Sequence, residues 1–136
     1  MKNLYRLQGM KTELFYFVLL ISLGLQLRAD FFDIETESDI RRIGGSFIDF
    51  YNKNYDFFQN HSTDLKKYKK DFFRNLSSNG SIFATLYGLD PNGFRRNFFE
   101  LRKDIIENSD RWEKPLGKSS FELFISGVYY LQKVFF

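Results

Sequence analysis

The chain has 136 residues, the length of one domain, and it contains no cysteine, which excludes disulfides, a thiolate nucleophile and thiolate metal sites. Its formal net charge is +3, but residues 1–29 hold four basic residues against a single acidic one, so residues 30–136 are neutral. A neutral body lacks the basic footprint of a nucleic-acid-binding domain, and we expect no nucleic-acid partner. The hydrophobic fraction of 43% and the aromatic fraction of 20% predict a globular domain with an aromatic core.

Residues 14–27 form an uncharged apolar run that follows Lys11 and Glu13 and ends at Arg28. As a helix this run would be about 21 Å long, shorter than the ~30 Å hydrocarbon core of a bilayer. Its length and its basic flank are typical of a signal peptide, with cleavage after Ala29 preferred over cleavage after Gly24.

We therefore expect residues 1–29 to be a signal peptide or an N-terminal anchor, and residues 30–136 to be a single small extracytoplasmic domain. Membrane contact is expected only through residues 14–27, and only if they stay uncleaved. Two alternatives remain open for this stretch. Translation could begin at Met10, and the apolar run could instead be a buried core helix.

Two amphipathic helices are predicted at the start of the domain. Residues 38–58 carry apolar side chains at spacings of three and four as far as Phe50, with Ser38 as the expected N-cap. Gly44 and Gly45 weaken this helix and indicate either a bend or a close packing contact. Residues 64–76 repeat the pattern, with lysines on the other faces.

The residues that follow differ in composition and in the spacing of their apolar side chains. In residues 81–88, small and aromatic side chains alternate, which predicts a strand, and residues 90–93 (DPNG) have the composition of a turn. Residues 94–99 would then continue as a hairpin partner or open a helix, and residues 100–109 favour a helix. Pro115 and Gly117 indicate a loop, and residues 120–136 read as a hairpin around Ser126-Gly127. The predicted fold is α+β, with two N-terminal amphipathic helices packed on a small antiparallel sheet.

Candidate chemistry is sparse. His61 is the only histidine and lies in a polar turn, and no nucleophile motif accompanies it. The lysines of residues 66–70 could suit phosphates or anionic lipid, but the flanking acids favour a solvated helix face. The acidic group of residues 30–39 is better suited to the positive end of a helix than to a cation. We expect no catalytic residue, no metal site and no cofactor.

One family resemblance concerns residues 38–94. A leader, a long helix, a short helix and then SIFATLYGLDPNGF resemble the start of an extracytoplasmic Cache (PAS-like) sensor domain. In that family a strand leads into an Asp-x-x-Gly turn, which Tyr87–Gly93 would supply here, and a ligand-facing Arg and aromatic residue follow. The resemblance implies a ligand-binding site formed by Tyr87, Arg111 and Trp112, in a free-standing or truncated sensor module.

The preferred functional prediction is an exported module that binds or senses a small-molecule ligand without catalysis. Its pocket would lie between sheet and helices and be lined by Tyr87, Arg111 or Trp112. The alternative is a secreted or surface-attached protein that binds a protein partner through an uncovered apolar patch at residues 134–136. The sequence leaves the oligomeric state open.

Overall fold

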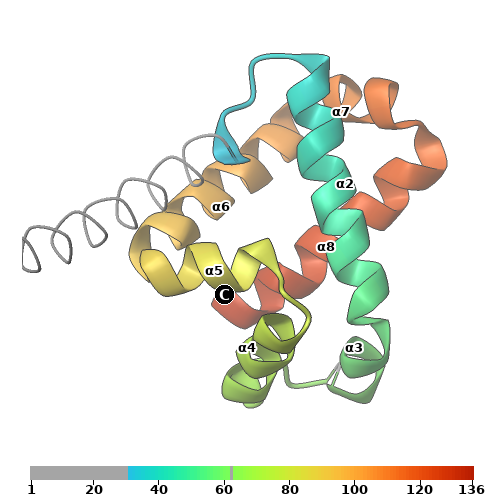
Figure 1. Ribbon diagram of the computed structural model, residues 1–136. Helices are drawn as coiled ribbons and strands as arrows, with labels where there is room; N and C mark the ends of the chain where they lie inside the picture. Colours follow the sequence, from blue (N-terminus) through green and yellow to red (C-terminus); the bar gives the residue numbers. More distant parts are fainter. Residues whose placement is uncertain (1–30, 62) are drawn as a thin grey trace, which may run out of the picture. The chain divides into compact units, whose positions relative to one another are not determined.

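The computed structural model describes residues 31–61 and 63–136, and the chain divides into two units, Met1–Phe31 and Phe32–Phe136, of which the second is considered below (Figure 1). The described helices of this unit are α2 (Glu37–Lys53), α3 (Tyr55–His61), α4 (Lys69–Ser78), α5 (Ile82–Leu89), α6 (Pro91–Glu107), α7 (Ser109–Leu116) and α8 (Lys118–Phe135). No strand occurs among the described residues, so the predicted α+β fold is wrong and the unit is all-α. The predicted signal peptide or anchor lies outside the described residues.

Helix α2 begins two residues earlier than expected, because its cap is Thr36 rather than Ser38. The Thr36 hydroxyl accepts a hydrogen bond from the Asp39 backbone N–H, and the Asp39 carboxylate accepts one from the Thr36 backbone N–H. This reciprocal pair satisfies two N–H groups that the first turn of a helix leaves without partners. Buried apolar side chains then follow at helical spacing: Ile40, Ile43, Phe47 and Phe50.

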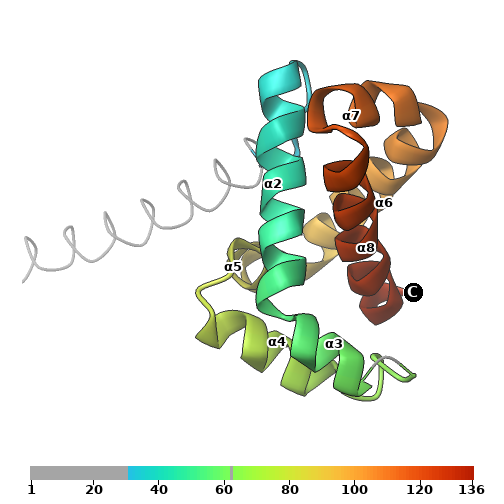
Figure 2. The same cartoon turned by 90° about the vertical axis from the view of Figure 1, so that its right-hand side faces the viewer.

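The most extensive helix contact joins α2 to α8, which lie side by side in Figure 2. Gly127 makes this approach possible, because a Cβ atom at that position would lie 2.8 Å from the Phe47 carbonyl oxygen. Gly44 plays a similar part against α7, where a Cβ atom would lie 2.7 Å from a Leu116 methyl group. Of the two interpretations of Gly44, close packing is therefore the one the structure shows, whereas Gly45 has open space around it.

The strand predicted at residues 81–88 is helix α5. Ser81 caps this helix through its hydroxyl, which accepts from the Phe83 N–H at 3.1 Å. Phe83 and Leu86 are buried at a spacing of three, which places them on one helix face. The prediction failed because an apolar run of eight residues fits a strand and a buried helix equally well.

The predicted turn at residues 90–93 is the beginning of helix α6. The Asp90 carboxylate accepts a hydrogen bond from the Gly93 N–H at 3.0 Å, and Pro91 occupies the first turn. Asp as N-cap followed by Pro is as typical of a helix start as of a β-turn. Residues 94–99, expected to pair as a hairpin or to open a helix, are part of this 17-residue helix.

The hairpin predicted for residues 120–136 is also wrong, since these residues belong to helix α8. Its buried side chains recur at spacings of three and four, and Ser126-Gly127 lies in the helix rather than at a turn. The chain reverses earlier, at Gly117, whose φ of +84° lies in the left-handed region that favours glycine. Pro115, expected in a loop, lies in the last turns of α7.

The two predicted N-terminal helices are both present with different limits. The span 38–58 is divided at Asn54 into α2 and α3, and the span 64–76 becomes helical only from Lys69. Asn54 is the one buried polar residue among those described. Its Oδ1 accepts from the side-chain amides of Asn75 and Asn79, and its Nδ2 donates to the Phe50 carbonyl at 2.9 Å. This network holds the end of α2 against α4.

The core is aromatic, as expected. Phe47 contacts the rings of Phe83 and Phe124 at centroid distances of 4.7 and 5.5 Å, and Phe50 contacts Phe58 at 5.3 Å. Such edge and tilted contacts are the arrangements that aromatic rings prefer. Within the described part of the chain, no helix has the length and apolar character needed to span a membrane.

Candidate functional site

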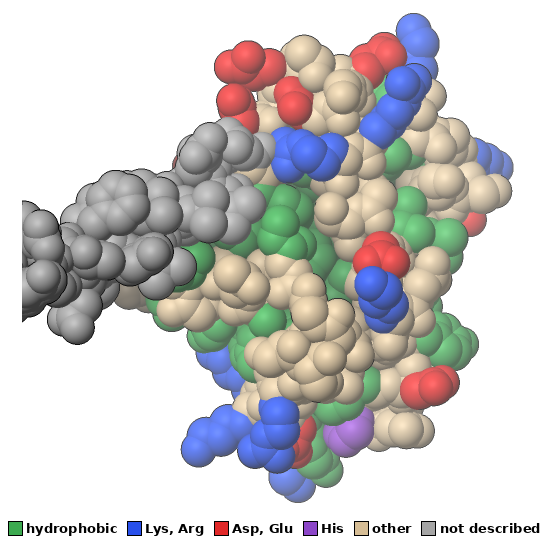
Figure 3. Space-filling model, viewed as in Figure 1, with side chains coloured by type: hydrophobic (Ala, Val, Ile, Leu, Met, Phe, Trp, Pro, Cys, Tyr) green, Lys and Arg blue, Asp and Glu red, His purple; other side chains and the backbone are tan. Residues whose placement is uncertain are grey.

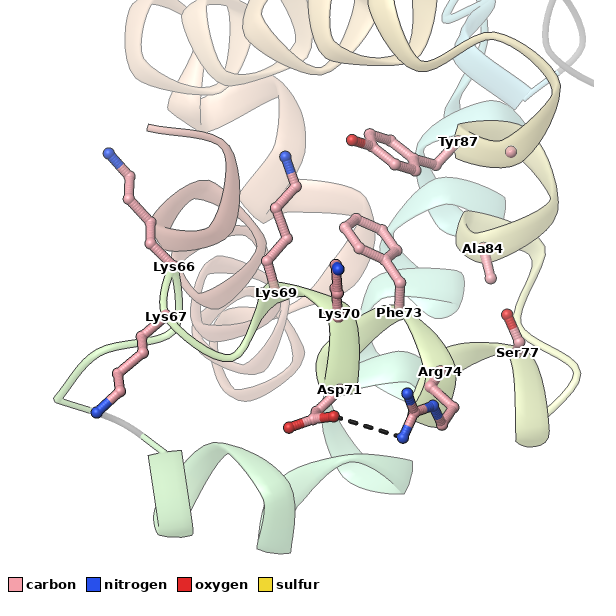
Figure 4. Close-up of a pocket in the computed structure, with 11 residues that line it drawn as sticks. Lys66, Lys67, Lys69, Lys70, Asp71, Phe73, Arg74, Ser77, Ala84 and Tyr87 are labelled. Atoms are coloured by element: carbon pink, nitrogen blue, oxygen red, sulfur yellow. Dashed lines mark ion pairs between the residues drawn. The ribbon is translucent and has the colours of Figure 1, made fainter.

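A hollow in the described unit lies between α5 and the segment that leads into and forms α4 (Figure 4). Its volume is about 1010 Å³. One wall comes from the turn before α4 and the first two turns of that helix, and the other comes from Ala84, Tyr87 and Gly88 of α5. One residue of the predicted site, Tyr87, therefore lines a real concavity.

Five basic side chains line this hollow, and only one acidic side chain accompanies them. The basic residues are Lys66, Lys67, Lys69, Lys70 and Arg74, and the acid is Asp71. We call this site the basic hollow. Lys and Arg side chains also gather at the α4 end of the space-filling view (Figure 3). The neutral charge of residues 30–136 thus conceals a strongly uneven local distribution.

The lysines do not all point the same way. Lys69 extends to the side on which Tyr87 lies, and Lys70 lies between Lys69 and Phe73. Lys66 lies beyond Lys69, on the side away from Tyr87, and Lys67 points away from the other lysines (Figure 4). The Nζ atom of Lys69 is 5.7 Å from the centroid of the Tyr87 ring, within cation–π range. None of the four ammonium groups forms an ion pair with another described residue.

The acid in the basic hollow is already engaged. Asp71 Oδ1 lies 3.6 Å from Nη1 of Arg74 in an i,i+3 ion pair. The other nearby acid, Asp64, accepts a hydrogen bond from the Lys67 backbone N–H at 3.2 Å. These two carboxylates, which the sequence suggested would offset the lysines, are directed to Arg74 and to the backbone instead.

Aromatic rings form the inner wall of the basic hollow. Tyr87 is stacked on Phe73, with centroids 4.2 Å apart and ring planes 10° from parallel. Tyr87 is held further by Phe135 and Phe94, at centroid distances of 5.5 and 6.1 Å. The ring is therefore fixed by its neighbours, and its hydroxyl points toward Lys69 (Figure 4).

The other two predicted site residues lie elsewhere, on α7, and neither lines the basic hollow. Trp112 is fully buried, stacks on Phe124 at 5.2 Å, and donates from Nε1 to the Asp104 carboxylate at 2.7 Å. Arg111 donates to the Ile34 carbonyl at 2.9 Å and pairs with Asp104 at 3.6 Å. In the described unit, Arg111 and Trp112 join helices and do not converge on Tyr87.

The acidic group before α2 acts on that helix. Backbone N–H groups of Glu35 and then Thr36 donate to the Asp39 carboxylate and hold its pKa below the usual value. This matches the capping role expected for acids at a helix N-terminus. No group of metal-ligating side chains large enough to hold an ion occurs in the residues that the structure covers.

A second, smaller hollow of about 200 Å³ lies beside the Asn54 network. Its charged residues, Asp49 and Lys53, pair with each other at 3.1 Å, so it presents little free charge. On the same helix, burial and the neighbouring rings of Tyr130 and Tyr55 raise the pKa of Tyr51. Neither feature brings together groups suited to a ligand as the basic hollow does.

The apolar patch expected at residues 134–136 is reduced to one residue of that stretch. Val134 and Phe135 are buried, whereas Phe136 is 42% exposed beside Phe99, which is 47% exposed. The two rings lie 5.9 Å apart, and the Arg95 guanidinium lies 5.2 Å from the Phe136 centroid.

The lysine cluster can be seen in the sequence, but the position of Tyr87 across the hollow from it cannot. Residues 66–70 and Tyr87 are about twenty positions apart and come together because α5 folds back on α4. Phe73 gave no signal as a site residue in the sequence.

Comparison with known proteins identifies no relative of this chain: no family model, no curated protein and no solved structure matches it. The resemblance to Cache domains gains no support from these comparisons, and the strand at residues 81–88 on which it rested is helix α5.

Proposed function

We propose that this chain is an exported, non-catalytic module that binds an anionic small molecule in the basic hollow. Export rests on the signal-peptide pattern of residues 1–29. The binding proposal rests on one observation: Lys66, Lys69 and Lys70 line a concavity whose only lining acid is paired with Arg74.

Physical reasons support an anion in this position. Like charges that are held close together repel, and the repulsion is relieved when a counter-charge enters between them. The Phe73–Tyr87 wall lowers the local exposure to water on one side, which strengthens the attraction relative to open solvent. The described residues supply no such counter-charge, so a bound ligand is the natural source.

Titration of the full chain with small anions would test the proposal directly. We expect binding of at least one phosphate, sulfate or dicarboxylate probe, detected by calorimetry or by a change in tyrosine fluorescence. Neutral analogues of the same size should not bind. Lys69→Gln should weaken binding at least tenfold, because the Lys69 ammonium lies 5.7 Å from the centroid of the Tyr87 ring that forms the inner wall.

Lys67→Gln is the matched control, since it removes the same charge from a side chain that points away from the other lysines. It should change affinity less than twofold. Equal losses in the two variants would show a diffuse electrostatic effect rather than a site, and absence of binding by every anion would refute the proposal.

A second candidate function, contact with a protein partner, is favoured by the exposed pair Phe99 and Phe136. Aromatic side chains beside an arginine are enriched in protein interfaces. Sedimentation of the full chain over a hundredfold range of concentration would detect self-association. A Phe99→Ser variant should abolish it if these rings form the contact.

A further inference from the structure

We propose that the anion recognised by the basic hollow is a phosphomonoester group, bound as its dianion by Lys66, Lys69, Lys70 and the Tyr87 hydroxyl. This inference rests on the proposed function and narrows the ligand to one chemical class. Four features of the hollow carry it.

The first feature is the amount of charge. Three of the lysines that line the hollow, Lys66, Lys69 and Lys70, have no ion-pair partner among the described residues, and the single lining acid is paired with Arg74. One negative charge would leave this cluster strongly positive. A phosphomonoester carries about −1.5 to −2 at neutral pH and presents three acceptor oxygens, so it offsets the cluster better than a monocarboxylate does.

The second feature is the type of donor. Planar carboxylates are best matched by the fork of an arginine, which donates two parallel hydrogen bonds. The only arginine in the hollow, Arg74, is paired with Asp71 at 3.6 Å. What remains are ammonium groups and one phenol hydroxyl. These donors rotate freely and can be arranged around the oxygens of a tetrahedral group.

The third feature is the position of the lysines on α4. Lys69 and Lys70 are the first two residues of this ten-residue helix, and its N-cap, Tyr68, contributes no side-chain hydrogen bond. Cations at a helix N-terminus oppose the helix dipole, so this arrangement costs the isolated helix stability. A dianion bound between the two lysines would offset both their mutual repulsion and the unfavourable interaction with the dipole.

The fourth feature concerns the rest of the ligand. The Tyr87 ring is stacked face to face on Phe73, and Lys69 lies 5.7 Å from its centroid. An aromatic group of the ligand therefore cannot insert between the two rings. Recognition acts through the phosphoryl group, and alkyl and aryl phosphates should bind with affinities within about threefold of each other.

The test compares four soluble probes on the full chain: glycerol phosphate, phenyl phosphate, sulfate and malonate. Glycerol phosphate and phenyl phosphate should bind at least tenfold more tightly than malonate at pH 7.5. Malonate binding as tightly as the phosphates would overturn the phosphoryl assignment and leave the proposed anion site intact. Failure of all four probes would overturn both.

The pH dependence gives an independent reading. Between pH 5.5 and 7.5 the affinity for glycerol phosphate should rise about fourfold, because the second pKa of a phosphomonoester is about 6. Sulfate stays a dianion over this range and corrects for pH effects that arise in the protein. A phosphate profile that parallels the sulfate profile would contradict recognition of the dianion.

Vesicles distinguish a lipid headgroup from a free phosphate ester as the source of the group. Phosphatidylcholine vesicles with phosphatidic acid present a monoester, and vesicles with phosphatidylglycerol at equal molar fraction present a diester. Binding to the first alone, lost in Lys69→Gln and kept in Lys67→Gln, assigns the lipid source. Soluble binding without vesicle binding assigns a free ester, and equal binding to both vesicles without soluble binding would overturn the inference.

Discussion

Two regions of the molecule contain aromatic rings and polar groups: the contact between α2 and α8, and the basic hollow beside α4. These groups are packed closely in the first region and left open to solvent on one side in the second. At the α2–α8 contact, Gly127 lets the backbones approach, and Phe47 and Phe124 fill the space between the helices. In the basic hollow, Phe73 and Tyr87 leave one side open, and lysines without ion-pair partners among the described residues surround the opening. The α2–α8 contact is closely packed. The basic hollow keeps a repulsion between lysine side chains that contributes nothing to the stability of the domain.

This contrast bears on function because functional sites are the places where proteins tolerate local rules being broken. Lysines at the start of α4 oppose the helix dipole, whereas Glu37 and Asp39 at the start of α2 complement it. The same chain therefore caps one helix well and another poorly. Substitutions at packed positions should therefore lower the free energy of unfolding, whereas removal of a lysine from the start of α4 should raise it.

The largest effect is expected at the packed core. Trp112→Ala removes a fully buried ring that stacks on Phe124 and leaves the Asp104 carboxylate without its indole donor. We expect a loss of about 3–5 kcal/mol in the free energy of unfolding. Urea denaturation followed by circular dichroism would measure it. Tyr87→Phe, which removes only a hydroxyl at the hollow, should change stability by less than about 0.5 kcal/mol.

The close approach of α2 and α8 at Gly127 can be tested with two alanine variants. Gly127→Ala places a methyl group 2.8 Å from the Phe47 carbonyl oxygen and should cost about 1–3 kcal/mol in unfolding free energy. Gly45→Ala, where nothing lies within 4 Å, should instead stabilise the helix by about 0.5–1 kcal/mol. Effects of the same sign at both positions would argue against the close approach.

The buried Asn54 network is the polar counterpart in the packed region. Asn54→Ala leaves the amides of Asn75 and Asn79 without their shared acceptor and should cost about 1–3 kcal/mol. Asn52→Ala changes the same residue type at an exposed position on α2 and serves as the control. Thermal unfolding of the two variants would compare them, and a neutral Asn54→Ala would show that the network adds nothing to stability.

The smallest expected change in unfolding free energy tests the contrast between the packed contact and the basic hollow most directly. Lys70→Gln removes a cation from the first turn of α4 and should raise the free energy of unfolding by about 0.3–1 kcal/mol at low salt. The same variant should weaken anion binding. The gain in stability should shrink at high ionic strength, because salt screens the interaction. A loss of stability in Lys70→Gln would contradict the view that the lysines are kept at a structural cost.

The fold was only partly predictable from the sequence. Residues 38–50 carry a long helical period, and that helix is present as α2. Residues 81–88 and 120–136 are predicted as strands from their local composition. The buried side chains of α8 nevertheless recur at the helical spacings of three and four. Ser126-Gly127 suggested a turn because its role, letting two helices touch, depends on a residue eighty positions away.

The candidate site shows the same division. Tyr87 is predicted as a site residue from a strand and turn that are helices α5 and α6 in the structure. Arg111 and Trp112 are grouped with it, although their partners are Asp104, Ile34 and Phe124. The sequence predicts that Asp64 and Asp71 offset the lysines of residues 66–70 on a solvated helix face. Side-chain pairing with Arg74 and the backbone decided otherwise.

The sequence by itself determined the features that depend on composition and on neighbouring residues: the absence of thiol chemistry, the aromatic composition of the core, the basic leader pattern and the helical period of residues 38–50. Only the tertiary structure decided whether short apolar runs became helices, since burial against a partner outweighs local preference in segments of eight residues. It also decided that residues 66–70 and Tyr87 share one hollow. The neutral charge of residues 30–136 could not reveal this, because charge attracts ligands through its arrangement in space and not through its sum.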